Sequence, residues 1–273
     1  MAKKYFPILF LIIIIFISCE SIQEPGLNNP VDPYSENQGY IIPKIDTLIG
    51  PDDGVTIKDH TVSFAWKGSE STLDFCFNLD GNSWSNWSSD TSVTFRFLDE
   101  GEHIFQVKGR SSAEEIETPI TAVFYVDAIQ GPALMMVPRK VILNEQENFE
   151  VEIFAEEVEN LSGLSFVIPY EKSELQLTEA TIYKQEKSIL TKDGGTVLNI
   201  VENDANNQIL EVSLGRVSDD QPGINGTGAL MRLSFQYNGA NDFIVRPSQV
   251  IFQSPDRGEI EVNEVTGCNI LIK

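Results

Sequence analysis

The 273-residue sequence predicts an all-β protein that contains two tandem β-sandwich domains. Two observations predict this class. From Ile45 onward, apolar residues alternate with polar ones in short runs, and turn signals such as Asp80-Gly81 and Glu100-Gly101 separate these runs. Alternation with a period of two, in runs spaced about 8–12 residues apart, is typical of antiparallel sheets with one buried face each. About 235 residues follow the amino-terminal region, which is enough for two domains of ordinary size.

Residues 1–18 are predicted to be a signal peptide. Lys3 and Lys4 precede an uncharged run from Tyr5 to Ser18. As a helix rising about 1.5 Å per residue, this run reaches roughly 21 Å, which is short of the hydrocarbon core of about 30 Å that a transmembrane helix must span. A basic start, an apolar centre and a small final residue are typical of a secretion signal.

The segment "FISC" (Phe16–Cys19) resembles the lipobox of bacterial lipoproteins, with Phe16 in the place where leucine is usual. The resemblance implies that Cys19 is acylated and becomes the first residue of the mature chain. More than one acyl chain gives stable anchoring, since each buried methylene contributes about 0.8 kcal/mol. Glu20 follows in place of the aspartate that retains some lipoproteins in the inner membrane, so an outer-membrane or surface location is expected. The alternative is an ordinary signal peptide with an incidental cysteine.

Residues 19–39 are predicted to be a flexible tether. The stretch "SIQEPGLNNPVDPYSENQ" is rich in proline and asparagine and holds few apolar residues. Such a segment cannot bury enough surface to offset the entropy lost on ordering.

Charge and cysteine content exclude several functions. Removal of residues 1–18 takes away two lysines and no acids, so the net charge goes from −22 to −24. A chain this acidic offers no basic patch to phosphates, which excludes nucleic acid as a partner. The acidic stretch "ENDANNQ" (202–208) does not match a calcium loop and is predicted to be a hairpin turn. Cys76 and Cys268 lie in different domains and are predicted to be buried free thiols.

Residues 40–129 form the first predicted domain. Its strands are expected at "VSFAW" (62–66), "LDFCFNL" (73–79), "VTFRF" (93–97), "IFQVK" (104–108) and "VFYVDA" (123–128). The segment 79–110, with its "LDG", its two tryptophans and its "GEHIFQV", resembles a bacterial immunoglobulin-like or fibronectin-like (Ig/FnIII) domain. The resemblance implies a spacer and no chemistry.

Trp84 and Trp87 lie three residues apart in a setting rich in serine and asparagine. Aromatic faces in such a setting can stack on sugar rings. The resemblance to Ig/FnIII domains favours the other interpretation, in which both rings cover the edge of the sandwich and anchor a hairpin. Both interpretations stay open at this point.

Residues 136–273 form the second predicted domain, with about nine strands in a large sandwich or jelly roll. The run "VILNEQENFEVEIFA" (141–155) alternates strictly, and further apolar runs continue to the terminal "CNILIK". Gly226 and Gly228 are expected to flank a turn. A short helix is expected only within residues 179–190.

The second domain resembles a cohesin. The residues that carry the resemblance are Gly163, Phe166, Val167, Tyr170, Leu175 and Leu177, then "QILEVSLG" (208–215), then Gly228, Leu230, Arg232, Leu233 and Phe235. The resemblance implies a nine-stranded jelly roll with no catalytic role, one sheet face of which docks a dockerin, a calcium-loaded helical module often carried by a polysaccharide-degrading enzyme. Gly163 and Ser165 stand where the best-known cohesins carry an asparagine and an aspartate that hydrogen-bond to the dockerin.

The sequence carries no enzyme signature. His60 and His103 lie near no plausible nucleophile, and no G-x-S-x-G, H-E-x-x-H or phosphate-loop motif occurs. We therefore expect no catalytic residue, no metal and no cofactor. Three hypotheses remain: a lipid-anchored receptor for a protein partner, a surface lipoprotein that binds polysaccharide, and a structural spacer of a surface assembly.

Overall fold

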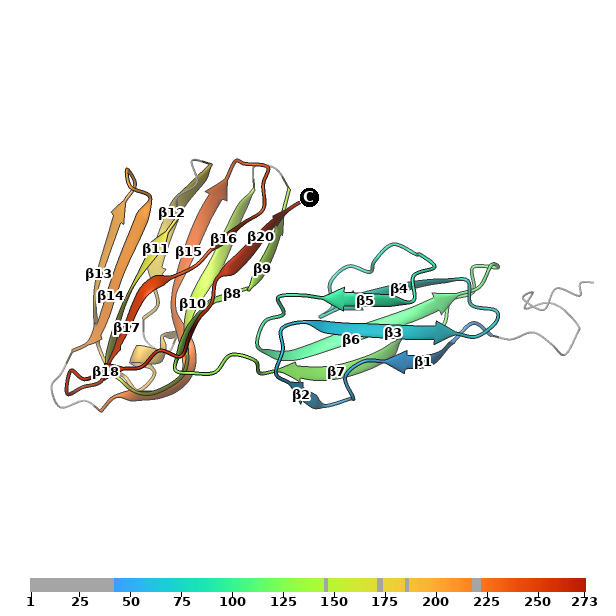
Figure 1. Ribbon diagram of the computed structural model, residues 1–273, viewed down its shortest axis with the longest axis horizontal. Coiled ribbons are helices and arrows are strands. Elements are labelled where there is room, and N and C mark those ends of the chain that lie inside the picture. The colour runs from blue at the N-terminus through green and yellow to red at the C-terminus, as the bar shows by residue number, and fades with distance from the viewer. Residues whose placement is uncertain (1–41, 145–146, 171–173, 185–186, 218–221) are drawn as a thin grey trace, which may run out of the picture.

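The computed structural model describes residues 42–144, 147–170, 174–184, 187–217 and 222–273. These residues form two β-sandwich modules joined by a short linker at residues 127–132. The strands of the first module run along the long axis of the molecule, whereas those of the second run across it (Figure 1). The predicted signal peptide, the tether and Cys19 lie outside the described residues.

The first module is a sandwich of a three-stranded and a four-stranded sheet. Phe64 and Phe105 stack between the sheets with ring centroids 3.9 Å apart, and Trp66, Phe77 and Phe95 pack around Phe105. The sheets are, in spatial order, β1 (Ile45–Ile49), β3 (Val62–Gly68) and β5 (Ser92–Phe95), and then β2 (Val55–Ile57), β7 (Ile120–Val126), β6 (Gly101–Arg110) and β4 (Asp74–Leu79).

The second module has two five-stranded sheets and a small third sheet. The first is β12 (Leu175–Ile182), β15 (Ile224–Tyr237), β10 (Asn148–Leu161), β8 (Ala133–Val137) and β19 (Glu264–Val265). The second is β13 (Val197–Asp204), β14 (Ile209–Arg216), β11 (Gly163–Pro169), β17 (Ser248–Gln253) and β18 (Glu259–Ile260). The third is β16 (Phe243–Val245), β20 (Cys268–Ile272) and β9 (Lys140–Leu143).

Alternation along the strands builds the core of the second module. On β11, Leu164, Phe166 and Ile168 point inward and are buried, while Ser165 and Val167 between them are partly exposed. The inward residues pack against those of β10 and β15 in one continuous apolar cluster. The outer face of the sheet that contains β11 therefore stays free of the core.

The predicted fold class, two tandem β-sandwiches, is confirmed. Thirteen strands, rather than about nine, occur in the described part of the second module, because β9, β16, β18 and β19 have only two to four residues each. Strands this short carry no periodic signal. β8 spans the expected boundary at residue 136 and pairs with β10, so this module begins earlier than expected.

The helix expected within residues 179–190 is wrong for most of that segment. β12 continues to Ile182, and only a 3-10 turn at Ile189–Thr191 follows among the described residues. Pairing of β12 with β15 overrides the local helix propensity. The turn expected at residues 202–208 is confirmed, with Asp204 accepting hydrogen bonds from the backbone N–H groups of Asn206 and Asn207. Cys76 and Cys268 are buried free thiols, as expected.

Polar contacts hold the two modules together at the junction. The Asp99 carboxylate of the first module accepts a hydrogen bond from the backbone N–H of Arg139 at 2.6 Å, and Lys140 Nζ donates to the carbonyl of Arg96 at 3.1 Å. Glu100 accepts hydrogen bonds from the linker N–H groups of Ala128 and Ile129. Burial raises the pKa of the Asp99 carboxyl. The linker is therefore bonded to its neighbours along most of its length.

Candidate partner-binding face

The candidate site is the outer surface of the sheet formed by β13, β14, β11 and β17, which we call the β11 face. Strand register sets the side chains of this face in rows. Gly163 pairs with Gly215 on one side and Gln253 on the other, and Ser165 pairs with Ser213 and Ile251. Next to β14, Leu198 pairs with Gly215 and Ile200 pairs with Ser213. Small residues thus occupy the two central strands, and larger ones flank them.

This arrangement gives a shallow trough with apolar walls. Gly163 and Gly215 supply its floor, and a Cβ at Gly163 would lie 3.0 Å from the Leu214 carbonyl oxygen, so a larger residue there would crowd the backbone. Leu198 and Ile200 are 68% and 62% exposed, and Ile251 is 41% exposed. Large aliphatic side chains that are left in water beside one another are typical of an interaction surface.

The two ends of the β11 face differ in charge. At one end, Glu202 pairs with Glu211, and Asp204 follows on the same strand face. At the other end, Arg216 pairs with Val197 and lies on the inner side of the sheet, where its buried guanidinium forms an ion pair of 2.7 Å with Asp193 and donates to the carbonyl of Leu190, so it adds no positive charge to the outer face. The hydrogen bond from Arg216 holds the pKa of the Asp193 carboxyl below its usual range. The acidic end therefore presents net negative charge to a partner.

The structure brings the two predicted partner-binding residues together, because Gly163 and Ser165 lie two residues apart on β11 and face the same trough. The sequence analysis did not identify Leu198 and Ile200 as residues of this face. A usable signal existed, since "VLNIV" (197–201) is apolar at Val197 and Val201 on its inner face and at Leu198 and Ile200 on its outer face. A strand with apolar residues on both faces, in a sheet expected to have one wet face, indicates a binding surface.

The predicted glycan-stacking residues Trp84 and Trp87 lie in the other module, in the loop after β4. Lys108 Nζ lies 4.0 Å from the ring centroid of Trp84, and the Arg110 guanidinium lies 4.7 Å from that of Trp87. Ser85 and Ser88 in this loop hydrogen-bond to the backbone of β4. A cation therefore covers one face of each ring, and a sugar could stack only on the opposite face. Stacking on a glycan stays a prediction.

Both histidines serve as hydrogen-bonding groups within the first module. His103 Nδ1 lies 2.8 Å from the Asp80 carboxylate, and its Nε2 lies 2.9 Å from the carbonyl of Asp99. Burial and the charge of Arg139 lower the pKa of His60, whose Nδ1 lies 3.0 Å from the carbonyl of Leu98. Across the described ranges, no group of three or more His, Cys, Asp or Glu side chains could hold a metal ion. No helix in the same ranges is long and apolar enough to cross a membrane.

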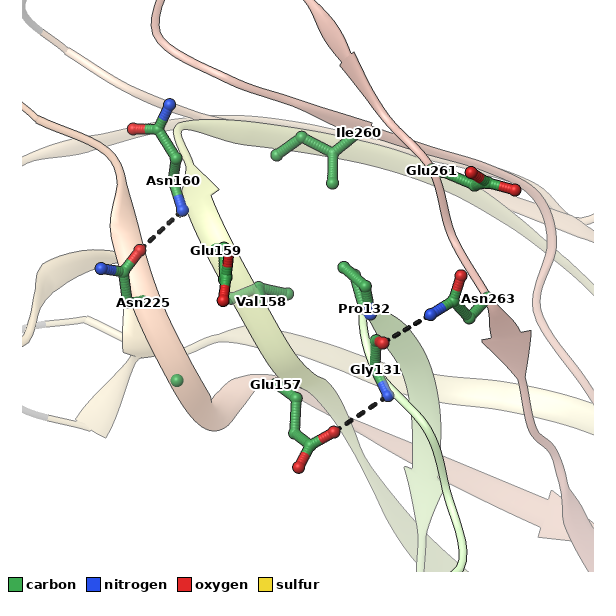
Figure 2. A pocket seen from close by; sticks show the side chains of 11 residues that line it. Gly131, Pro132, Glu157, Val158, Glu159, Asn160, Asn225, Ile260, Glu261 and Asn263 are labelled. Carbon is green, nitrogen blue, oxygen red and sulfur yellow. Dashed lines mark hydrogen bonds between the residues drawn. The ribbon is translucent and has the colours of Figure 1, made fainter.

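A larger pocket lies beside the linker (Figure 2). Glu157 accepts a hydrogen bond from the N–H of Gly131, and Asn263 Nδ2 donates to the carbonyl of Gly131. Asn160 donates its N–H to the side chain of Asn225 at 2.7 Å. The bonds of Glu157 and Asn263 fix the linker against β10 and the β18–β19 connection, and the bond of Asn160 joins β10 to β15.

No protein-family model matches the sequence, and no curated protein matches it at a significant level. Solved structures that resemble it include the sixth cohesin of scaffoldin B from Acetivibrio cellulolyticus, crystallised with a Cel5 dockerin mutant (15% identity, 53% of this chain and 100% of that chain covered, TM-score 0.42). They also include type II cohesin A11 from Bacteroides cellulosolvens (13% identity, 52% of this chain and 99% of that chain covered, TM-score 0.42). A third is a non-cellulosomal cohesin from Archaeoglobus fulgidus (13% identity, 52% of this chain and 90% of that chain covered, TM-score 0.39). The chain is thus similar to cohesin domains over about half of its length.

Proposed function

We propose that this chain is a non-catalytic lipoprotein of the bacterial cell envelope, anchored through Cys19, whose second module holds a protein partner on the β11 face. The observation that carries the proposal is the exposed apolar wall of Leu198, Ile200 and Ile251 around the trough of Gly163 and Ser165. The sequence resemblance to cohesins supports the finer proposal that the partner is a dockerin-type module, borne by an enzyme that degrades polysaccharide.

The size of the apolar wall sets what it can contribute. Full burial of a large aliphatic side chain contributes about 1.5–3 kcal/mol, so covering the exposed parts of Leu198, Ile200 and Ile251 contributes about 3–5 kcal/mol in total. Association costs at least about 4 kcal/mol in lost translational and rotational freedom. Apolar contact alone is therefore insufficient, and polar contacts at Ser165 and Ser213 must add to it.

The trough also sets the kind of contact. Gly163 and Ser165 supply neither the amide nor the carboxylate that the best-known cohesins use, so hydrogen bonds come from the hydroxyls of Ser165 and Ser213. A hydroxyl both donates and accepts, and it carries no charge. Recognition at the centre of the face is accordingly neutral, and charge acts only at the acidic end.

The test is capture of a partner by the full chain immobilised in detergent, from an envelope extract, with and without EDTA. Ile200→Asp places a charge on the face, and Ile244→Asp is the matched control, because Ile244 is similarly exposed on β16, outside the face. We expect one or more proteins to be retained by the parent chain and by Ile244→Asp, and lost with Ile200→Asp or EDTA. Equal retention by both variants would refute the proposal, and retention in EDTA would refute the dockerin form alone.

A further inference from the structure

We infer that the free edge of β13 is a second docking site, which accepts an extended segment of another polypeptide as an added β-strand. This site is distinct from the β11 face, because it uses the backbone of an edge strand and the opening between the two sheets rather than the outer side chains of one sheet.

The hydrogen-bonding pattern of β13 leaves one edge open. Val217 N–H donates to the carbonyl of Thr196 at 2.9 Å, so Thr196 and Val217 form a hydrogen-bonded pair. Such pairs alternate along an antiparallel ladder. The register from Val197 to Asp204 is continuous, so the intervening residues direct their N–H and C=O groups away from β14. These residues are Val197, Asn199, Val201 and Asn203. Among the described residues, no backbone hydrogen bond reaches these groups from the open side.

The first five residues of β13, residues 197–201, lack the devices that protect sheet edges, because the charges of this strand, Glu202 and Asp204, lie at its far end. Short length, bulges, proline and charged side chains, lysine above all, are the usual protection against strand addition. β13 is eight residues long, has no shift in its register with β14, and contains neither proline nor lysine. The other edges of the two large sheets differ, since β18 and β19 have two residues each and β12 has a register shift between Leu177 and Glu179. β13 is thus the long, regular and open edge of the described part of this module.

A groove beside β13 fits the side chains of an added strand. It has a volume of about 310 Å³ and is lined on one side by Val197 and Asn199 and on the other by Ile182 and Tyr183, which lie at the end of β12. Alternate side chains of an added strand point to opposite faces. One set therefore enters this groove between the sheets, and the other set lies beside Leu198 and Ile200 on the outer surface.

Charge and composition identify the occupant as a different polypeptide. The far end of β13 carries Glu202 and Asp204, and Glu211 lies opposite Glu202 on β14. In the described part of the chain, no salt bridge neutralises these three carboxylates. A second copy of β13 has no cation to offer, and the net charge of −22 opposes self-association. The fitting segment alternates apolar residues with polar ones and carries lysine or arginine at the end that meets Glu202.

The test uses the full chain in detergent and a fluorescein-labelled peptide of sequence KVTVTVTK, followed by fluorescence anisotropy. Asn199→Pro removes an N–H that points away from β14, so it blocks strand addition and spares the ladder. Asn199→Ser is the matched control, because it keeps that N–H. The same peptide with N-methyl groups at every internal residue is the ligand control. Amide hydrogen exchange of Val197, Asn199, Val201 and Asn203 is measured with and without peptide.

We expect saturable binding to the parent chain and to Asn199→Ser, at least tenfold weaker binding to Asn199→Pro, and none of the methylated peptide. Exchange at the four edge amides should slow at least tenfold on binding. Absence of saturable binding, equal binding by Asn199→Pro, or binding of the methylated peptide would overturn the inference. A dimer of the parent chain in sedimentation, absent in Asn199→Pro, would also overturn it in favour of a second copy. If Asn199→Pro loses its circular dichroism, Asn199→Lys replaces it, since it places a charge at the groove.

Discussion

The β11 face is free of internal packing only if its apolar side chains can be replaced without loss of stability. Ile200→Thr tests this, because threonine keeps the branched shape that favours a strand. Ile200 is 62% exposed, so the folded chain buries little more than a third of it. At about 1.5–3 kcal/mol for full burial, the substitution removes about 0.5–1 kcal/mol of stability at most. Leu214 on the adjacent strand is 4% exposed, and Leu214→Ala should cost about 2–5 kcal/mol.

The assay is urea unfolding of the second module, followed by far-ultraviolet circular dichroism. All three tryptophans lie in the first module, so tryptophan fluorescence reports that module separately and serves as an internal control. We expect Ile200→Thr to leave both transitions nearly in place, and Leu214→Ala to move only the transition that fluorescence does not report. A loss above about 2 kcal/mol for Ile200→Thr would refute the reasoning, because an exposed side chain cannot contribute so much.

Three further predictions concern the first module and the junction. Phe105→Ala should destabilise the first module by about 3–5 kcal/mol, because the fully buried ring stacks on Phe64; the fluorescence-detected urea midpoint measures this, and an unchanged midpoint would contradict it. Burial opposes the charged form of His103, but hydrogen bonds to Asp80 and the Asp99 carbonyl outweigh it and raise the pKa above 6.5. The contribution of protonated His103 to stability is therefore present below pH 6.5 and is lost as pH rises through the raised pKa. Melting temperatures measured from about pH 5 to 9 should show this loss in the parent chain but not in Asp80→Asn. Asp99→Ala leaves the N–H of Arg139 without its acceptor, at a cost of about 1–3 kcal/mol. The substitution should broaden the distribution of distances between spin labels placed on the two modules. An unchanged distribution would show that the junction does not depend on this contact.

Much of the fold could be predicted from side-chain alternation. The runs at 62–66 and 73–79 correspond closely to β3 and β4. β3 has one buried and one wet face, which gives a clear period of two, whereas β4 buries residues on both faces, including Phe75 and Cys76. β9 and β16 could not be found this way, because three or four residues are too few to show a period. In the segment at 179–182, Glu179 and Ala180 are good helix formers, whereas the β-branched Thr181 and Ile182 favour a strand, and the long-range pairing with Met231 to Ser234 decides for the strand.

The candidate site could be predicted only in part. Gly163 and Ser165 were identified through the resemblance to cohesins, and the structure places both in the trough. Leu198 and Ile200 were not identified; the apolar residues on both faces of 197–201 signal a second apolar face, but which face stays exposed depends on where β13 lies in the sheet, and a sequence does not give strand order. For the same reason the open edge of β13 could not be predicted. Cys19, Trp84 and Trp87 stay predictions, as does the Ig/FnIII family of the first module.

The most direct test of the proposed receptor role is site-specific photo-crosslinking in intact cells. A benzophenone amino acid replaces Ser165 at the centre of the trough, and in a second strain it replaces Ile244 outside the β11 face. We predict that irradiation yields a defined protein adduct from position 165 and none from position 244. No adduct from position 165, or the same adduct from both positions, would contradict the claim that this face holds a protein partner.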